Sequence, residues 1–96
     1  MADGATWTFL SNHAHVVILL GNDPALRMRD LAERIGVTER AIQRIVHELA
    51  EAGYLEVHKE GRRNRYEVRR DRTLRHPIEA GVRVGALIDL VDRPGR

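Results

Sequence analysis

Residues 28–55 read MRDLAERIGVTERAIQRIVHELAEAGYL, and the spacing of the apolar residues in this stretch decides the fold. The first part carries one apolar helical face, made of Leu31, Ala32 and Ile35. Gly36 stands where a helix commonly ends on a left-handed residue, and Thr38 can accept a backbone hydrogen bond as the N-cap of the next helix. The stretch therefore predicts a short helix, a tight turn and a second helix over residues 39–52.

The second helix is amphipathic. Its apolar residues fall on one face: Ile42, Ile45, Val46 and Leu49. Val37 and Ile42 have the spacing of a hydrophobic staple around the cap. The other side carries polar groups: Glu39, Arg40, Gln43, Arg44 and His47. We expect Glu48 and Glu51 to lie away from the arginines, which would leave the exposed face basic.

After this helix the period of the apolar residues changes from about 3.6 to about 2. Apolar residues alternate with charged ones on both sides of a loop over residues 59–64: Leu55 and Val57 before it, Tyr66 and Val68 after it. This pattern predicts a two-stranded antiparallel hairpin with the sequence GRRN at its tip. Gly61 supplies the backbone freedom that a hairpin turn needs.

The two ends of the chain complete the predicted fold. Ser11 can cap a first helix of about ten residues, and we expect Trp7 and Phe9 to anchor the amino-terminal arm on a core. Pro77 suits the start of a last helix over residues 78–91. The order α-α-α-β-β-α predicts a mostly α winged helix-turn-helix with a small β-hairpin. We expect residues 1–76 to form the winged domain with its arm, and residues 77–93 to be a separate terminal helix.

The 96 residues suffice for one domain, which is a marginal size for a stable monomer. The chain has no cysteine, so a disulfide framework or a thiolate metal site is excluded. No apolar run approaches the length of about 18 residues that a membrane span requires. We therefore expect a cytoplasmic protein without a membrane partner.

The positive charge is concentrated in one stretch. Residues 1–58 hold 5 arginines and 8 acids, a net charge of −3, whereas residues 59–75 hold 8 basic residues and 3 acids, a net charge of +5. Residues 76–96 are balanced, which accounts for the total of +2. Such an asymmetry favours a polyanionic partner.

The segment WTFLSNHAHV at residues 7–16, the stretch quoted above and EGRRNRY at residues 60–66 together carry a family resemblance. Over residues 7–78 the chain resembles the MarR/ArsR-type winged-helix transcriptional regulators of prokaryotes. The resemblance implies that the predicted hairpin, which is the wing of this fold, contacts DNA and that terminal helices pair the subunits.

The second helix has the side chains that major-groove readout requires. Arginine bonds guanine bidentately and glutamine does the same to adenine, and residues near the helix start reach the base edges. We expect DNA contacts from Thr38, Glu39, Arg40, Gln43, Arg44 and His47. Thr38 should lie near a phosphate, and His47 near the sugar–phosphate backbone of the DNA.

The hairpin tip explains the concentration of arginines. Arginine inserted into a narrow minor groove meets enhanced negative potential. We expect Arg62 and Arg63 to make this contact, and Asn64 and Arg65 to bond phosphate or sugar. Tyr66 should point into the core.

The last helix is apolar around much of its circumference. The candidate dimer contacts are Ile78, Val82, Val84, Leu87, Ile88 and Val91. Gly81 and Gly85 would allow a partner to approach closely. Two copies would read half-sites about 34 Å apart on a near-palindrome of double-stranded DNA.

Other functions have weaker support in the sequence. A winged helix used only for protein contact shares every fold signal, and it is the main alternative. The five histidines are scattered, so we expect neither a metal site nor a cofactor. No phosphate loop or nucleophile–base pair suggests an enzyme. A small-molecule effector could bind between the first helix, the arm and the last helix.

Overall fold

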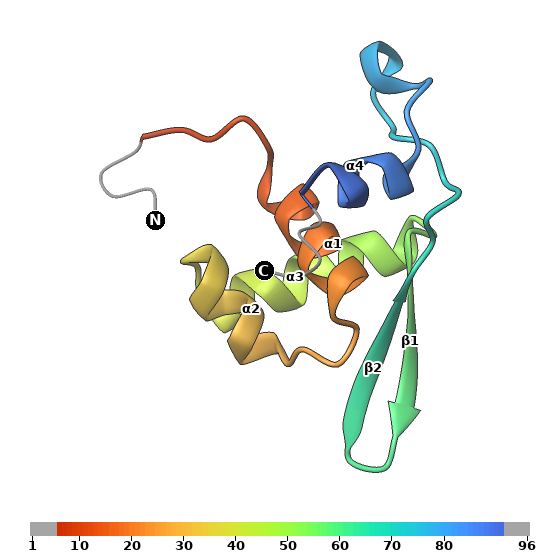
Figure 1. The fold of residues 1–96 in the computed structure, drawn as a ribbon. Helices are drawn as coiled ribbons and strands as arrows, with labels where there is room; N and C mark the ends of the chain where they lie inside the picture. Colours follow the sequence, from red (N-terminus) through yellow and green to blue (C-terminus); the bar gives the residue numbers. More distant parts are fainter. Residues whose placement is uncertain (1–5, 92–96) are drawn as a thin grey trace.

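The computed structural model describes residues 6–91 and contains three helices, a hairpin, a 3₁₀ turn and a last helix (Figure 1). The elements are α1 (Asn12–Asn22), α2 (Met28–Ile35), α3 (Glu39–Glu51), β1 (Leu55–Glu60), β2 (Arg63–Val68), η1 (Pro77–Glu79) and α4 (Val84–Val91). This order confirms the predicted winged helix-turn-helix.

The helix ends follow the predicted caps. The Ser11 hydroxyl accepts from the Ala14 N–H at 3.2 Å, and the Thr38 hydroxyl accepts from the Ala41 N–H at 3.0 Å. Gly36 has φ of 89°, in the left-handed region where an L side chain is strained. The turn between α2 and α3 is therefore fixed by local chemistry.

The core lies where α1, α2, α3 and the base of the hairpin meet. Its largest fully buried side chains come from four helices: Val16, Leu20, Leu31, Ile42, Ile45, Val84 and Ile88. The four apolar residues predicted for the inner face of α3 are all buried. Packing of this face sets the direction in which the polar side of α3 points.

The hairpin is longer than predicted. β1 pairs with β2 from Leu55↔Val68 to Glu60↔Arg63, so the turn contains only Gly61 and Arg62. Residues 63 and 64 lie in the strand and not in the predicted loop, because φ of 65° at Gly61 permits a two-residue turn. Tyr66 is buried as expected, whereas Val57 on the neighbouring strand is 45% exposed.

The loop between α1 and α2 supports the outer strand of the wing. The Tyr66 N–H donates to the Pro24 carbonyl at 3.1 Å, and the Arg63 guanidinium donates to the Ala25 carbonyl at 2.9 Å. These bonds cover part of the edge of β2 and hold the wing against the helical body.

The prediction of one continuous helix over residues 78–91 was wrong. The 3₁₀ turn at Pro77–Glu79 is followed by a turn at residues 80–81 and a β-bridge at Arg83, and α4 begins only at Val84. Thr73 and Arg83 form an isolated antiparallel bridge, and the Val84 N–H donates to the Arg72 carbonyl at 2.8 Å. These backbone bonds compete with helix formation before residue 84.

α4 packs against α1 and completes the core. Val84 and Ile88 are buried, and a Cβ added at Gly21 would lie 2.5 Å from Ile88 Cδ1. The two helices therefore need a glycine at their contact. Since α4 shares the core of the preceding helices, the division predicted at residue 76 separates two proposed functions and not two separately packed units.

The expected anchoring of the amino-terminal arm was also wrong. Trp7 is 67% exposed and Phe9 is 92% exposed, and their rings contact each other edge to face with centroids 5.0 Å apart. The arm extends away from the body in Figure 1. Within residues 6–91, every helix is too short or too polar to cross a bilayer.

Candidate nucleic-acid interface

The outer face of α3 presents the predicted recognition side chains. Arg40, Gln43, Arg44 and His47 are all exposed. Thr38 and Glu39, at the start of the helix, are exposed too. The Thr38 oxygen already accepts the capping bond, so its hydroxyl hydrogen is what it can offer to a phosphate. Burial of the opposite face leaves this one directed outward.

The expectation that Glu48 lies away from the arginines of α3 was wrong, whereas Glu51 pairs with His47 and, among the described residues, with no arginine. Arg44 Nη1 lies 3.4 Å from Glu48 Oε2, and His47 Nε2 lies 3.8 Å from Glu51 Oε2. Residues four apart are neighbours on a helix surface, so the spacing in the sequence already indicates these pairs. The basic face of α3 is therefore partly neutralised toward its carboxyl end.

The wing provides cations that the fold does not use. Within the part of the chain that the structure describes, three basic side chains of the hairpin are exposed and make no hydrogen bond or ion pair: Lys59, Arg62 and Arg65. Arg62 lies in the turn itself. We call these three residues the wing cations.

For two wing residues the structure changes the predicted assignment of DNA contacts. Arg63 is exposed but donates to the Ala25 carbonyl, so its guanidinium is partly committed to the fold. Lys59 pairs in register with the predicted contact Asn64 and is a further candidate that the sequence analysis did not name. The alternation of the strand was the signal for Lys59, because opposite residues in a hairpin share a face.

Three of the arginines that follow the wing bind the protein itself. Arg69 pairs with Glu56, and Arg70 Nη2 lies 2.7 Å from Asp89 Oδ1 of α4. Arg72 Nη2 donates to the Ala52 carbonyl at 3.1 Å, and its guanidinium lies 5.4 Å from the centre of the Tyr54 ring. We call Arg69, Arg70 and Arg72 the stapling arginines. Much of the predicted basic stretch thus holds the chain's own segments together.

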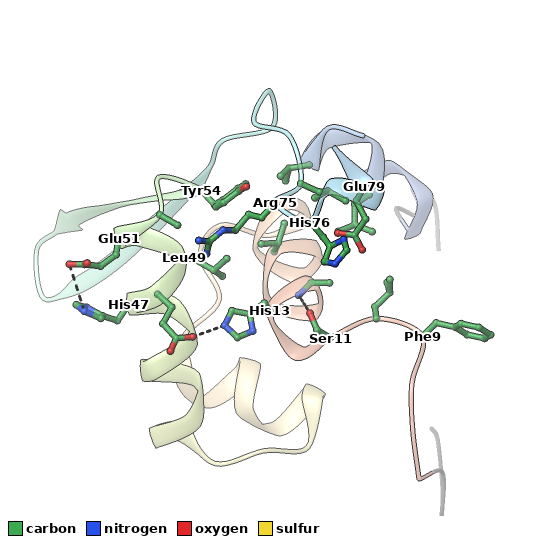
Figure 2. A pocket seen from close by; sticks show the side chains of 18 residues that line it. Phe9, Ser11, His13, His47, Leu49, Glu51, Tyr54, Arg75, His76 and Glu79 are labelled. Atoms are coloured by element: carbon green, nitrogen blue, oxygen red, sulfur yellow. Dashed lines mark hydrogen bonds and ion pairs between the residues drawn. The ribbon is translucent and has the colours of Figure 1, made fainter. Parts of the chain in front are cut away.

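A cleft of about 840 Å³ opens between the start of α1, the second half of α3 and the segment around η1 (Figure 2). Its apolar lining includes Val17, Leu49 and Leu87, and its rim carries charged or titratable groups. The rim groups are His13, His47, Glu48, Glu51, Arg75, His76 and Glu79. Phe9 of the arm lines the cleft, but Trp7, which was expected there, does not.

One group of side chains on the wing has donor atoms close enough for a metal ion. Glu56, His58 and Glu67 each offer one ligand atom, and these atoms lie within 4.8 Å of one another. His58 Nε2 lies 3.1 Å from Glu67 Oε1 and 3.4 Å from Glu56 Oε1. Arg69 already pairs with Glu56 and contributes a competing positive charge. A network of ion pairs at the surface, without a metal, would show the same contacts.

Comparison with known proteins places this architecture in a family. The model of the MarR family matches residues 8–65, which include all three helices of the helix-turn-helix core and most of the wing. The chain belongs to the MarR family. No curated protein sequence matches it.

A solved structure supports the fold. The chain is similar to the zinc-dependent MarR family transcriptional regulator AdcR in its Zn(II)-bound state, with 24% identity and a TM-score of 0.50. The similarity covers 68% of this chain and 47% of the AdcR chain, so this chain matches about half the length of that regulator. At this identity the likeness shows the winged-helix fold alone.

Proposed function

We propose that this MarR-family chain is a sequence-specific, double-stranded DNA-binding transcriptional regulator that acts as a homodimer. The observation that carries the proposal is that the same fold exposes two surfaces with basic side chains. One is the exposed Arg40, Gln43 and Arg44 side of α3, and the other is the adjoining wing with its uncommitted cations. The family membership supports the same function.

In the proposed complex α3 enters the major groove. Arg40 and Arg44 can each bond the O6 and N7 of guanine, and Gln43 can bond the N6 and N7 of adenine. Thr38 and Glu39 lie at the start of the helix, which is the part that reaches base edges in this motif, and His47 lies a turn further along toward the backbone. Base contacts of this kind would supply the sequence preference.

The wing is proposed to follow the flanking minor groove and the phosphate backbone. Arg62 occupies the turn and is the candidate for insertion, with Lys59, Asn64 and Arg65 beside phosphates. Arg63 would orient the wing through its bond to the Ala25 carbonyl and contact DNA only secondarily.

The homodimer proposal rests on apolar groups that the chain leaves uncovered. Val84 and Ile88 lie in the chain's own core, so these two predicted contacts cannot also face a partner. Exposed apolar side chains lie on α4 and on the segment that precedes it: Ile78, Val82, Leu90 and Val91, with Ile78 87% exposed and Leu90 73% exposed. Leu87 is half-buried at the edge of the cleft. Pairing through these residues would place two recognition helices on one near-palindrome.

A small-molecule effector could occupy the cleft beside α1, because its apolar base and polar rim suit a small amphipathic ligand. We propose neither a cofactor nor an enzymatic activity. A cytoplasmic, nucleoid-associated location accords with the proposed role.

The test is binding to random-sequence and genomic duplex DNA over a salt series. Selection from the random pool should enrich one near-palindromic sequence, and affinity for it should fall steeply with salt because counterions are released from the duplex. Sedimentation equilibrium should give a dimer. If no duplex binds at low salt, the DNA-binding proposal fails and the winged helix serves as a protein-interaction module.

A further inference from the structure

Glu48 on the recognition helix is shared between two basic side chains from different helices. His13 Nε2 of α1 lies 2.7 Å from Glu48 Oε1, whereas Arg44 Nη1 of α3 approaches the same carboxylate only to 3.4 Å and 3.5 Å. Figure 2 shows the His13 ring directed at a carboxylate of α3 along the cleft wall. The contact of His13 is thus the shorter one, and it comes from outside the recognition helix.

We infer that His13 is a positioning residue for the recognition helix, because it holds Glu48 toward α1 and leaves the Arg44 guanidinium available to DNA. This inference rests on the proposed DNA-binding function and adds a residue from α1 to the determinants of affinity. His13 would touch no base or phosphate itself.

The reason is competition for one carboxylate. Glutamate and arginine at positions i+4 and i attract each other on a helix surface. Without His13 the Glu48 carboxylate is free to close fully on Arg44, which neutralises the guanidinium and brings an acid toward the phosphates. The hydrogen bond from His13 is the main cause that lowers the pKa of Glu48, ahead of an opposing desolvation and of the attraction of Arg44. The carboxylate is thus engaged more strongly by α1 than by its own helix.

His15 provides a matched control. It belongs to the same helix, two residues further on, but its Nδ1 lies 3.2 Å from Asn12 Oδ1 and makes this contact within α1. Replacement of His15 by alanine removes an imidazole of the same kind without touching Glu48.

The experiment is a double-mutant cycle measured as DNA affinity by fluorescence anisotropy, on the selected duplex at low salt. We expect His13→Ala to weaken binding about two- to threefold, the size of a surface ion pair. Glu48→Gln should strengthen binding by about two- to fivefold, since it removes an acid beside the phosphates. The double variant should bind as Glu48→Gln does, because an uncharged amide cannot neutralise Arg44 whether or not His13 holds it. His15→Ala should bind as wild type, and His13→Gln should retain most of the affinity through its amide N–H.

Two results would overturn the inference. One is an equal loss of affinity on His13→Ala in the wild-type and Glu48→Gln backgrounds, which would indicate a merely structural role. The other is His13→Ala binding as tightly as wild type or more tightly. If wild type itself binds no DNA, the proposed function has failed and the inference fails with it. If wild type binds and the cycle is additive, the inference alone fails. Thermal unfolding of each variant verifies that it is folded.

Discussion

The wing cations and the stapling arginines lie within a few residues of each other in the sequence but have opposite roles in the structure. Lys59, Arg62 and Arg65 project from the hairpin without partners among the described residues, whereas Arg70 and Arg72 bind groups of α4 and the end of α3. A guanidinium that already donates to a carbonyl or carboxylate has fewer N–H groups left for phosphate. Charge density in a sequence therefore overestimates the charge that is available for nucleic acid.

The largest expected effect is on DNA affinity, which should depend on the wing cations much more than on the stapling arginines. Simultaneous replacement of the three wing cations by alanine should weaken DNA binding at least about tenfold at low salt. It should also flatten the logarithmic salt dependence by about 0.9 for each phosphate that the variant no longer neutralises. The free energy of unfolding should change by less than about 0.5 kcal/mol, because these exposed side chains make no hydrogen bond or ion pair within the described chain. Titration of DNA followed by anisotropy at several salt concentrations measures the affinity and its salt dependence.

Replacement of the stapling arginines provides the control for that experiment. The variant Arg69→Ala/Arg70→Ala/Arg72→Ala removes the same formal charge but should leave most of the salt dependence intact. An equal flattening of the salt dependence by both triple variants would contradict the division into two groups.

Among the stapling arginines, Arg72 should contribute most to stability. Arg72→Ala removes a hydrogen bond to the Ala52 carbonyl and a cation–π contact with Tyr54, which together are worth about 1–2 kcal/mol. Urea unfolding followed by circular dichroism measures the change in stability. Arg75→Ala is the matched control, since Arg75 is exposed in the same segment and makes no side-chain bond in the described part of the chain. Equal stability of the two variants would remove the structural role of Arg72.

The Arg70–Asp89 pair should have a smaller effect. Both side chains are at least half exposed, so solvent screens their attraction, and a double-mutant cycle should give a coupling of about 0.3–1 kcal/mol. The coupling should shrink in concentrated salt. A coupling that does not respond to salt would indicate packing of the aliphatic part of Arg70 and not an ion pair.

The smallest effect concerns pH and the recognition helix. Because the pKa of Glu48 is lowered in the folded protein, chiefly by the hydrogen bond from His13, its stabilising contribution is present above its unfolded value of 4.5. That contribution is lost as the pH falls through the lower folded value. Unfolding measured from neutral pH down to strongly acidic pH should therefore depend on pH slightly less in Glu48→Gln than in wild type. The same slope in both proteins would show that the carboxylate is not engaged.

Local chemistry was enough to predict α1, α2, α3 and the hairpin. Caps at Ser11 and Thr38, a left-handed Gly36 and the change in apolar period act between residues close in the chain, so the sequence contains them directly. The exposed side of α3 was predictable for the same reason, since burial of one face fixes the other. The ion pairs within α3 are equally local, because the four-residue spacing by itself places Glu48 beside Arg44 and Glu51 beside His47.

By itself the sequence determined the order of elements, the recognition face and the excess of positive charge around the wing. Tertiary structure alone decided which cations remain available, because the partners of Arg63, Arg70 and Arg72 lie in the α1–α2 loop, in α4 and at the end of α3. It also decided that the last helix begins at Val84 and packs its apolar side on Gly21 of α1. These outcomes depend on contacts between segments distant in the chain, and no local periodicity records which of several apolar or basic residues will meet such a partner.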